Sequence, residues 1–460
     1  MIFVVVMIFN IIIFTHELGH FLAGKWRGLQ IDRFQIWFGR PIWSQTIRGV
    51  QYGLGWIPAG GFVALPQMAP MESIEGGNTH AASLPPITPL DKIIVAFAGP
   101  LFSLLLALLA AGVVWQVGKP HDFVPTQVIG TVLPDGPAHK AGLRPGDKII
   151  EVNGKPVHGY AGSLDSIFES IILSQGQQIE FTVERPGAAS PLKIVSTFEI
   201  PEKSHWFHRS GLRRVGIQPQ GEYIAIDNVL KDSPASRAGL KPADRLSALD
   251  GVKCTNTDQA YEHIKQAGLK PIEFEIERAG VSEKITVTPA VPSAPAGKGP
   301  MIGLRFDDVQ YVDETIVYPK PMLQVVDSLT MMWTTITRLV SRDSSIGIDH
   351  LSGPIGIAKH QYAILQGEHA WQRLLAFMVL FNVNLAVLNM LPFPVLDGGH
   401  ITLAILEKIA RRPVKVRVLE VVQTAFALLL ISLMLYVSTK DVGDSFGRGT
   451  SKKEKIIFAP

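Results

Sequence analysis

The chain has 460 residues and a formal net charge of +3, with 47% apolar and 18% charged residues. This composition argues against a disordered chain and against a single water-soluble domain, since soluble domains carry about 25% charged residues. The near-neutral charge predicts no nucleic-acid partner, because such partners normally require a basic domain. The single cysteine, Cys254, excludes an intramolecular disulfide and a cysteine-based zinc cluster.

Apolar residues gather in four segments along the chain. Residues 1–15 carry no charge, and charge-free runs of 26, 23 and 19 residues occupy 93–118, 374–396 and 421–439. A bilayer core of ~30 Å takes ~20 helical residues to cross. The fold class that we predict is therefore a multi-pass α-helical membrane protein. Its four transmembrane helices are expected at 1–24, 91–118, 373–397 and 418–439.

The first apolar run continues into the motif His16-Glu17-Leu18-Gly19-His20. Residues i and i+4 share one face of a helix, so His16 and His20 can ligate one metal ion. Glu17 lies about 100° round the helix from His16, which is near enough to take a proton from water at that metal. The motif therefore predicts a zinc site with Glu17 as its catalytic carboxylate.

This segment has two other interpretations. A cleaved signal peptide fits poorly, because no basic segment precedes the apolar run and no small-residue cleavage site follows it. Two buried histidines satisfied by hydrogen bonds would still need a partner for Glu17, because an unpaired charge inside a membrane is costly.

A soluble region with an internal repeat follows the second apolar run. Segments 136–154 and 233–251 align at an offset of 97 residues, and each contains Ala-Gly-Leu, a turn, and an Asn-Gly or Asp-Gly pair. Each segment predicts a short helix, a strand and a tight hairpin. Alternating strands follow at 179–183 and 272–276.

This pattern resembles the PDZ domain, so we predict two extracytoplasmic α+β PDZ domains at 122–221 and 222–292. PDZ domains bind extended peptides by adding a strand to a sheet edge, and they often capture a C-terminal carboxylate. The alternative is a pair of spacers that bind nothing. Residues 293–372 are predicted to form a linker and amphipathic helices.

The third apolar run ends in a second polar cluster, Asn389, Pro392, Pro394 and Asp397. A catalytic zinc site takes three protein ligands and keeps one position open, and Asp397 is the acidic residue that borders this run on its cytoplasmic side. The prolines free backbone carbonyls, which membrane proteins tolerate only against protein or a wet cavity. Asn389 adds an amide that can hold a substrate backbone. A simple kink and a helix-end charge are the alternatives.

Together these features resemble the site-2 protease family of intramembrane zinc metalloproteases. The resemblance runs from the first helix to about Phe446. It includes four further segments: Phe38–Arg40, Pro58–Phe62, Ala98–Pro100 and Leu351–Lys359. It implies that His16, His20 and Asp397 bind Zn²⁺ and that Glu17 is catalytic. Asn389, Pro392 and Pro394 match the segment of the family that handles substrate.

The resemblance also assigns a role to residues 25–90, where the segments 51–54 and 61–65 alternate like strands. In the family such a loop forms a membrane-associated β structure beside the active site. An edge strand at Gly60 and Gly61 is expected to bind unwound substrate by strand addition. A plain amphipathic loop is the alternative.

The family implies a bacterial inner-membrane enzyme of an envelope stress response, acting in regulated intramembrane proteolysis. Its expected substrates are single-span proteins already trimmed outside, such as anti-sigma factors, and remnant signal peptides. The PDZ pair is expected to act as a size filter or as a reader of new C-termini. A non-catalytic membrane PDZ scaffold is the main alternative. An ion-coupled transporter is another, but no inverted repeat is visible.

Basic residues follow the first helix and fill the loop 398–417, which places residues 25–90 and 398–417 in the cytoplasm. Both termini and the PDZ domains are then periplasmic, with the active site near the cytoplasmic side. The tail 440–460 is also expected outside, and its end, 447–460, matches nothing in the family and looks like a foreign addition.

Overall fold

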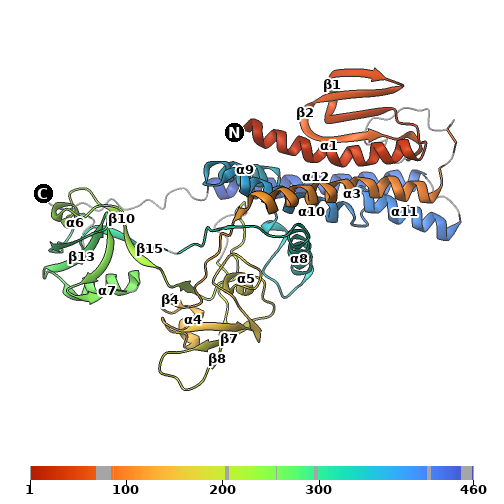
Figure 1. The fold of residues 1–460 in the computed structure, drawn as a ribbon. Helices are drawn as coiled ribbons and strands as arrows, with labels where there is room; N and C mark the ends of the chain where they lie inside the picture. Colours follow the sequence, from red (N-terminus) through yellow and green to blue (C-terminus); the bar gives the residue numbers. More distant parts are fainter. Residues whose placement is uncertain are drawn as a thin grey trace. The chain divides into compact units, whose positions relative to one another are not determined.

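A computed structural model describes residues 2–68, 84–85, 87–201, 207–254, 256–294, 299–309, 311–411, 416–446 and 458. The chain forms two compact units (Figure 1). The membrane unit comprises residues 1–120, 316–339 and 348–444, and the second unit comprises residues 121–315, 340–347 and 445–460. The prediction about residues 447–460 lies almost entirely outside the described residues.

Four helices of the membrane unit, among the described residues, are long and apolar enough to cross a bilayer. They are α1 (Ile2–Trp26), α3 (Pro89–Val117), α10 (Ala370–Asn389) and α12 (Val416–Phe446). The other helices are η1 (Pro66–Met68), α8 (Pro321–Val340), η3 (Ile348–His350), α9 (Pro354–Gln366) and α11 (Asp397–Ala410). The short strands β3 (Lys119–Pro120) and β16 (Ile316–Val317) pair with each other.

Small residues bring the membrane helices close together. Ala107, Ala110 and Ala111 of α3 are buried against Val379 and Val383 of α10. Membrane helices pack through such small side chains because lipid offers no hydrophobic driving force between helices. Figure 1 shows α3 running alongside both α1 and α10, so α3 forms the middle of this helix layer.

The third predicted span needs correction. The helix expected over 373–397 is α10, which ends at Asn389. A second helix, α11, starts at Asp397, the last residue of the predicted span, and runs through the predicted loop 398–417 as far as Ala410. Pro392 and Pro394 lie in the connection, where proline removes backbone donors and ends regular helix hydrogen bonding. The fourth helix also continues beyond the predicted end at 439, to Phe446.

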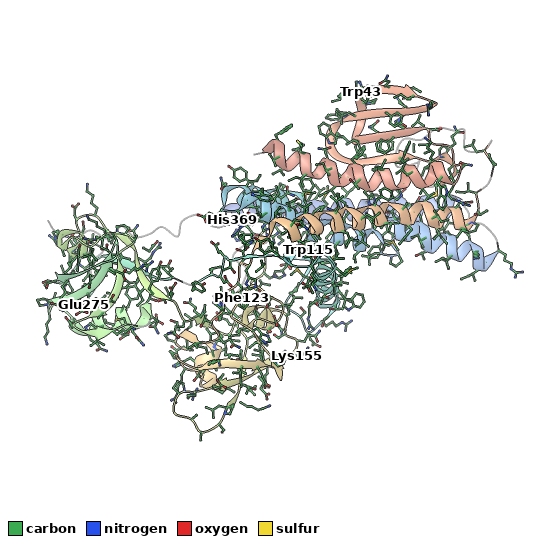
Figure 2. All side chains as sticks on the ribbon, in the orientation of Figure 1. Trp43, Trp115, Phe123, Lys155, Glu275 and His369 are labelled. Atoms are coloured by element: carbon green, nitrogen blue, oxygen red, sulfur yellow. The ribbon has the colours of Figure 1, made fainter. Side chains whose placement is uncertain are left out.

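The loop after α1 forms a long, twisted hairpin of β1 (Arg33–Ile47) and β2 (Val50–Ala64). Residues 33–36 pair with residues 61–64 on one side and with residues 51–54 on the other. Residues 51–54 also pair with residues 43–46. Segments 61–64 and 43–46 are therefore the two edges of this sheet. Trp43, at the second edge, is 54% exposed (Figure 2).

The second unit contains two lobes of helices and antiparallel strands, each with its own hydrophobic core. The first lobe contains β4 (Ile129–Val132), α4 (Pro137–Ala141), β5 (Lys148–Val152), β6 (Lys155–Pro156), α5 (Ile167–Ile172), β7 (Gln178–Glu184), β8 (Leu192–Thr197) and β9 (Ile217–Pro219). The second contains β10 (Tyr223–Val229), α6 (Pro234–Ala238), β11 (Arg245–Leu249), β12 (Val252–Lys253), α7 (Thr257–Ala267), β13 (Ile272–Arg278), β14 (Val281–Val287) and β15 (Leu304–Val309). Lys155 and Glu275 mark the two lobes in Figure 2.

The second lobe extends past the predicted boundary at residue 292. Its sheet has the order β14-β13-β11-β10-β15, so β15 completes it, and Phe306 of β15 is part of the buried core. The linker predicted between the lobe and the membrane helices therefore contains a strand of the lobe itself.

The repeat seen in the sequence recurs as matching contacts. In the first lobe, the Arg185 guanidinium donates to both Asp147 carboxylate oxygens, at 2.7 and 2.8 Å, and to the Gly142 carbonyl at 2.7 Å. In the second lobe, Arg278 donates to Asp244 and to the Gly239 carbonyl at distances of 2.7, 2.7 and 2.9 Å. Both lobes therefore use one scaffold of buried, bidentate ion pairs.

One of the differences between the two repeats has a conformational cost. Ala243 replaces the glycine found at residue 146, and both residues have a positive φ, +70° for Ala243 and +89° for Gly146. The left-handed conformation costs a residue with a Cβ roughly 1–2 kcal/mol. The turn is kept in the second lobe despite this cost.

Candidate metal and active site

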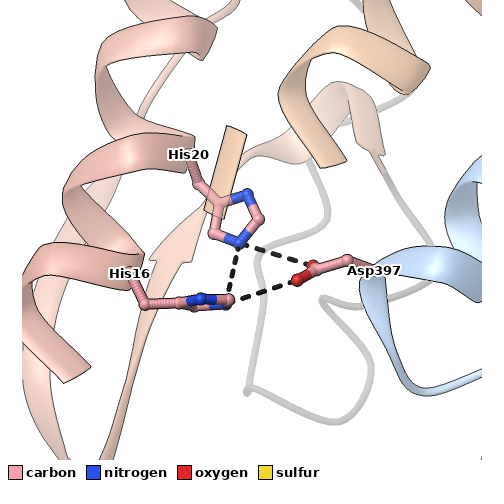
Figure 3. Close-up of side chains that lie close together, drawn as sticks. All are labelled: His16, His20 and Asp397. Atoms are coloured by element: carbon pink, nitrogen blue, oxygen red, sulfur yellow. Dashed lines mark hydrogen bonds and ion pairs between the residues drawn. The ribbon is translucent and has the colours of Figure 1, made fainter. Parts of the chain in front are cut away.

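The side chains of His16, His20 and Asp397 meet in the membrane unit (Figure 3). The two histidines come from adjacent turns of α1, and Asp397 is the first residue of α11. The His16 and His20 Nε2 atoms are 3.3 Å apart. The Asp397 oxygens lie 3.3 Å from His16 Nε2 and 3.4 Å from His20 Nε2.

These separations match a tetrahedral zinc site. Bonds of about 2.0–2.1 Å from zinc to nitrogen or oxygen imply ligand separations of about 3.3–3.4 Å along the edges of a tetrahedron. Asp397 Oδ2 is buried and has no hydrogen-bond partner among the described residues. Two imidazole nitrogens and a carboxylate, with a fourth position left open, are the donor set of a catalytic zinc. The residues present therefore fit this metal.

Helix α3 orients both imidazoles. His20 Nδ1 donates to the Val95 carbonyl at 2.8 Å, and His16 Nδ1 lies 3.0 Å from the Ser103 hydroxyl. A hydrogen bond at Nδ1 selects the tautomer whose Nε2 lone pair is free for a metal. Sequence reasoning missed Ser103, although it is the one hydroxyl side chain in the charge-free run 93–118.

Glycines let the helices approach the site. A Cβ added to Gly99 would lie 2.2 Å from His20 Nε2, and one added to Gly19 would lie 2.4 Å from the Ala98 carbonyl oxygen. Both positions therefore exclude any larger side chain unless the helices separate. In the sequence Gly99 belongs to the family segment Ala98–Pro100, and no pattern indicates that it adjoins the histidines.

Asp397 is positioned by tight packing of the α10–α11 connection. A Cβ added to Gly398 would lie 2.2 Å from the Met390 carbonyl oxygen, and one added to Gly399 would lie 2.0 Å from that of Phe393. These two glycines let the connection fold directly against the first turn of α11.

An ion pair further along α11 joins it to α3. The Lys92 ammonium lies 2.8 Å from a Glu407 carboxylate oxygen. Helix α11, and with it Asp397, is thus held at a defined position against α3, the helix that orients both histidines.

One cavity contains most of the predicted site residues. Its lining includes the three metal-site residues together with Glu17, Asn389, Gly60, Gly61 and His400. The Asn389 Nδ2 atom lies 3.4 Å from His16 Nε2. Pro392 and Pro394 are not in this lining; they shape the connection, where the Pro394 carbonyl accepts a hydrogen bond from Gln423 of α12 at 3.2 Å.

The edge segment of β2 adjoins the His16–His20 motif. A Cβ added to Gly61 would lie 3.0 Å from the Ile13 side chain and 3.3 Å from Glu17 Cγ. The sheet edge at 61–64 therefore borders the cavity, with Glu17 next to it.

Comparisons with known proteins give one consistent result. The sequence profile of peptidase family M50 matches residues 3–433. A Neisseria meningitidis protein named "Putative zinc metalloprotease" is 30% identical over 93% of this chain and 95% of its own length. The regulators of sigma-E protease (RseP) of Salmonella typhimurium and Escherichia coli are 28% and 27% identical, each over 92% of this chain and 94% of its own length.

Among solved structures, the PDZ domain of an SdrC-like protein from Listeria monocytogenes aligns with part of the chain. It covers 20% of this chain and 94% of its own length, with 15% identity and a TM-score of 0.18.

Proposed function

Because this chain belongs to peptidase family M50 and is an intramembrane zinc metalloprotease, we propose that it cleaves the membrane segments of single-span proteins. The proposed substrates are anti-sigma factors already trimmed on the outer side and remnant signal peptides, and the proposed setting is an envelope stress response at a bacterial inner membrane. The names of the Salmonella and Escherichia relatives support this setting. The observation that carries the proposal is the His16–His20–Asp397 group, whose separations fit zinc, in a unit of membrane-length helices.

In this proposal His16, His20 and Asp397 hold the zinc, and Ser103 and the Val95 carbonyl orient the imidazoles. When bound, zinc polarises the scissile carbonyl and lowers the pKa of water toward ~7. Glu17 takes a proton from the attacking water and later gives it to the leaving amine. Such positioned acid–base catalysis contributes about 10²–10⁴-fold to the rate.

The substrate is proposed to lie along the free edge of β2. Helical substrate hides its amides, so cleavage requires an extended peptide, and a free strand edge can hold one. Gly60 and Gly61 lie at this edge beside Glu17, and Asn389 holds the substrate backbone from the α10 side of the cavity. Exposed Ile42, Trp43 and Trp56 support contact of the hairpin with the membrane, because aromatic residues favour its interface.

We assign the two lobes as PDZ domains on the periplasmic side, together with both termini, and propose that they exclude bulky substrates. In each lobe, one backbone group of an edge strand is already hydrogen-bonded to a tyrosine of the same lobe. Tyr160 donates to the carbonyl of Ile217 in β9 at 2.9 Å, and the amide of Phe306 in β15 donates to the Tyr261 hydroxyl at 2.8 Å. Peptide capture by strand addition at β9 or β15 would have to displace these bonds, which favours the size filter over the reader of C-termini.

The central test compares wild type with Glu17→Gln on a membrane-embedded reporter, with zinc measured in both. We expect Glu17→Gln to keep zinc and lose cleavage, since the proton acceptor is gone and the ligands remain. We expect His16→Ala, His20→Ala and Asp397→Ala each to lose zinc as well. Cleavage by Glu17→Gln at the wild-type rate would overturn the proposal.

The filter is tested by removing residues 121–315. Pro120 pairs with Ile316, so a short Gly-Ser linker can join these ends as a hairpin without moving either. The filter predicts that this variant cuts substrates that keep their outer domains, which wild type leaves intact. An intact substrate that stays uncut would refute the filter. Slower cutting of trimmed substrates in the variant, and of C-terminally amidated ones in wild type, would favour the reader.

A further inference from the structure

His400 is a buried histidine that the chemistry above does not use. It lies on α11, one turn after Asp397, and is only 5% exposed. Its side chain lines the same cavity as Glu17, His16 and His20. Its Nε2 atom is buried and has no hydrogen-bond partner within the described part of the chain.

An unpaired buried polar atom calls for an explanation. Leaving one unsatisfied costs about 1–3 kcal/mol, and most buried polar side chains avoid this cost by pairing. A histidine that only stabilised α11 would gain by hydrogen bonding to a neighbouring helix. The cost is therefore better explained by a group that enters the cavity during the reaction.

His400 is not one of the metal-site residues. Among the described residues, the group of side chains able to share a metal ion contains His16, His20 and Asp397 alone. His400 also comes from the α11 side of the cavity, whereas Glu17 comes from α1. The cavity therefore has an acid–base group on one helix and an unused imidazole on another.

We propose that His400 is a catalytic residue that donates an Nε2–H hydrogen bond to the scissile carbonyl oxygen as negative charge develops there. No proton is transferred in this step, and the bond strengthens in the transition state. The inference rests on the proposed peptidase reaction. Donors aimed at such an oxygen act strongly in a site that excludes water, and loss of one lowers kcat about 10²–10³-fold. Helix α11 keeps the donor rigid through the close packing of Gly398 and Gly399.

The test uses the full-length, zinc-loaded protein in lipid nanodiscs. Three variants are compared: His400→Leu removes the donor, His400→Gln supplies an amide N–H, and Thr402→Val is the matched control. Thr402 lies on the same helix and its hydroxyl donates to the Gly398 carbonyl, outside the cavity lining. The measurements are zinc content, kcat on a reporter peptide, and affinity for that peptide and for its phosphinic analogue. Peptide affinity is measured in the Glu17→Gln background.

We expect His400→Leu to keep one zinc per chain and to bind the peptide within about threefold of wild type. Its kcat and its affinity for the tetrahedral phosphinic analogue should fall together, by about 10²-fold or more. His400→Gln should recover part of both, and Thr402→Val should match wild type. If His400→Leu does not fold, the Gln variant still decides, because the proposal requires it to bind zinc and retain intermediate activity.

Three results would overturn the assignment. If kcat is unchanged in His400→Leu, His400 has no catalytic role. If that variant loses zinc, His400 supports the metal site instead. If its affinity for the peptide and for the analogue falls equally, His400 is a general binding residue. Failure of the proposed function is distinguishable, since wild type would then not cleave the reporter, or Glu17→Gln would still cleave it, whatever His400 does.

Discussion

Replacing Gly99 with alanine should damage the metal site through one methyl group. The added Cβ would lie 2.2 Å from His20 Nε2, 2.5 Å from His20 Cε1 and 2.9 Å from His16 Cε1. Ordinary contacts begin at 3.4 Å, so the His20 ring and α3 must separate by about 1.2 Å (3.4 minus 2.2). A misplacement of about 1 Å in a catalytic group can cost about 10²-fold in rate. We expect zinc affinity to fall about 10–100-fold, the range seen when groups that orient ligands are lost.

The same helix supplies the control. Gly112 also lies in α3, and nothing lies within 4 Å of a Cβ added there. Gly→Ala gains up to about 1 kcal/mol of helix propensity at either position, so propensity cancels in the comparison. Zinc affinity is measured by chelator competition and activity by reporter cleavage, for Gly99→Ala, Gly112→Ala and wild type. Wild-type zinc affinity in Gly99→Ala would refute the assigned geometry of the site.

Two further predictions concern substrate and stability. Asn389→Leu should slow reporter cleavage and leave zinc content unchanged, and loss of zinc would instead show that Asn389 supports the metal. In the second lobe, burial raises the pKa of Asp244, but hydrogen bonds from Arg278 and the Lys241 amide outweigh it and hold the pKa below its ordinary value. The stability from this ion pair is therefore present above about pH 4 and lost as the pH falls further. Arg278→Leu should cost about 3 kcal/mol at pH 7, and hydrogen exchange of β11 amides in the full chain should show it. Equal protection in variant and wild type would contradict the role of this pair.

The sequence alone determined what depends on local spacing. Helical periodicity places His16 and His20 on one face, apolar length predicts the membrane helices, and the 97-residue repeat predicts two lobes with matching turns. The sequence also indicated Asp397 as a metal ligand, because it is the acidic residue that borders the apolar run 374–396. Apart from the repeat, which compares two distant segments, these inferences use residues that are close along the chain, where backbone geometry decides which side chains share a face.

The tertiary structure decided what depends on contacts between distant segments. Ser103 lies 87 residues from His16, and the histidine–aspartate group joins α1 to a helix nearly 380 residues later. The clearance at Gly99, the unpaired Nε2 of His400 and the closure of the second lobe by β15 likewise come from packing between elements. Helix length and hydrophobicity do not specify which faces meet, since lipid solvates every apolar face alike and the contacts of small residues select the arrangement.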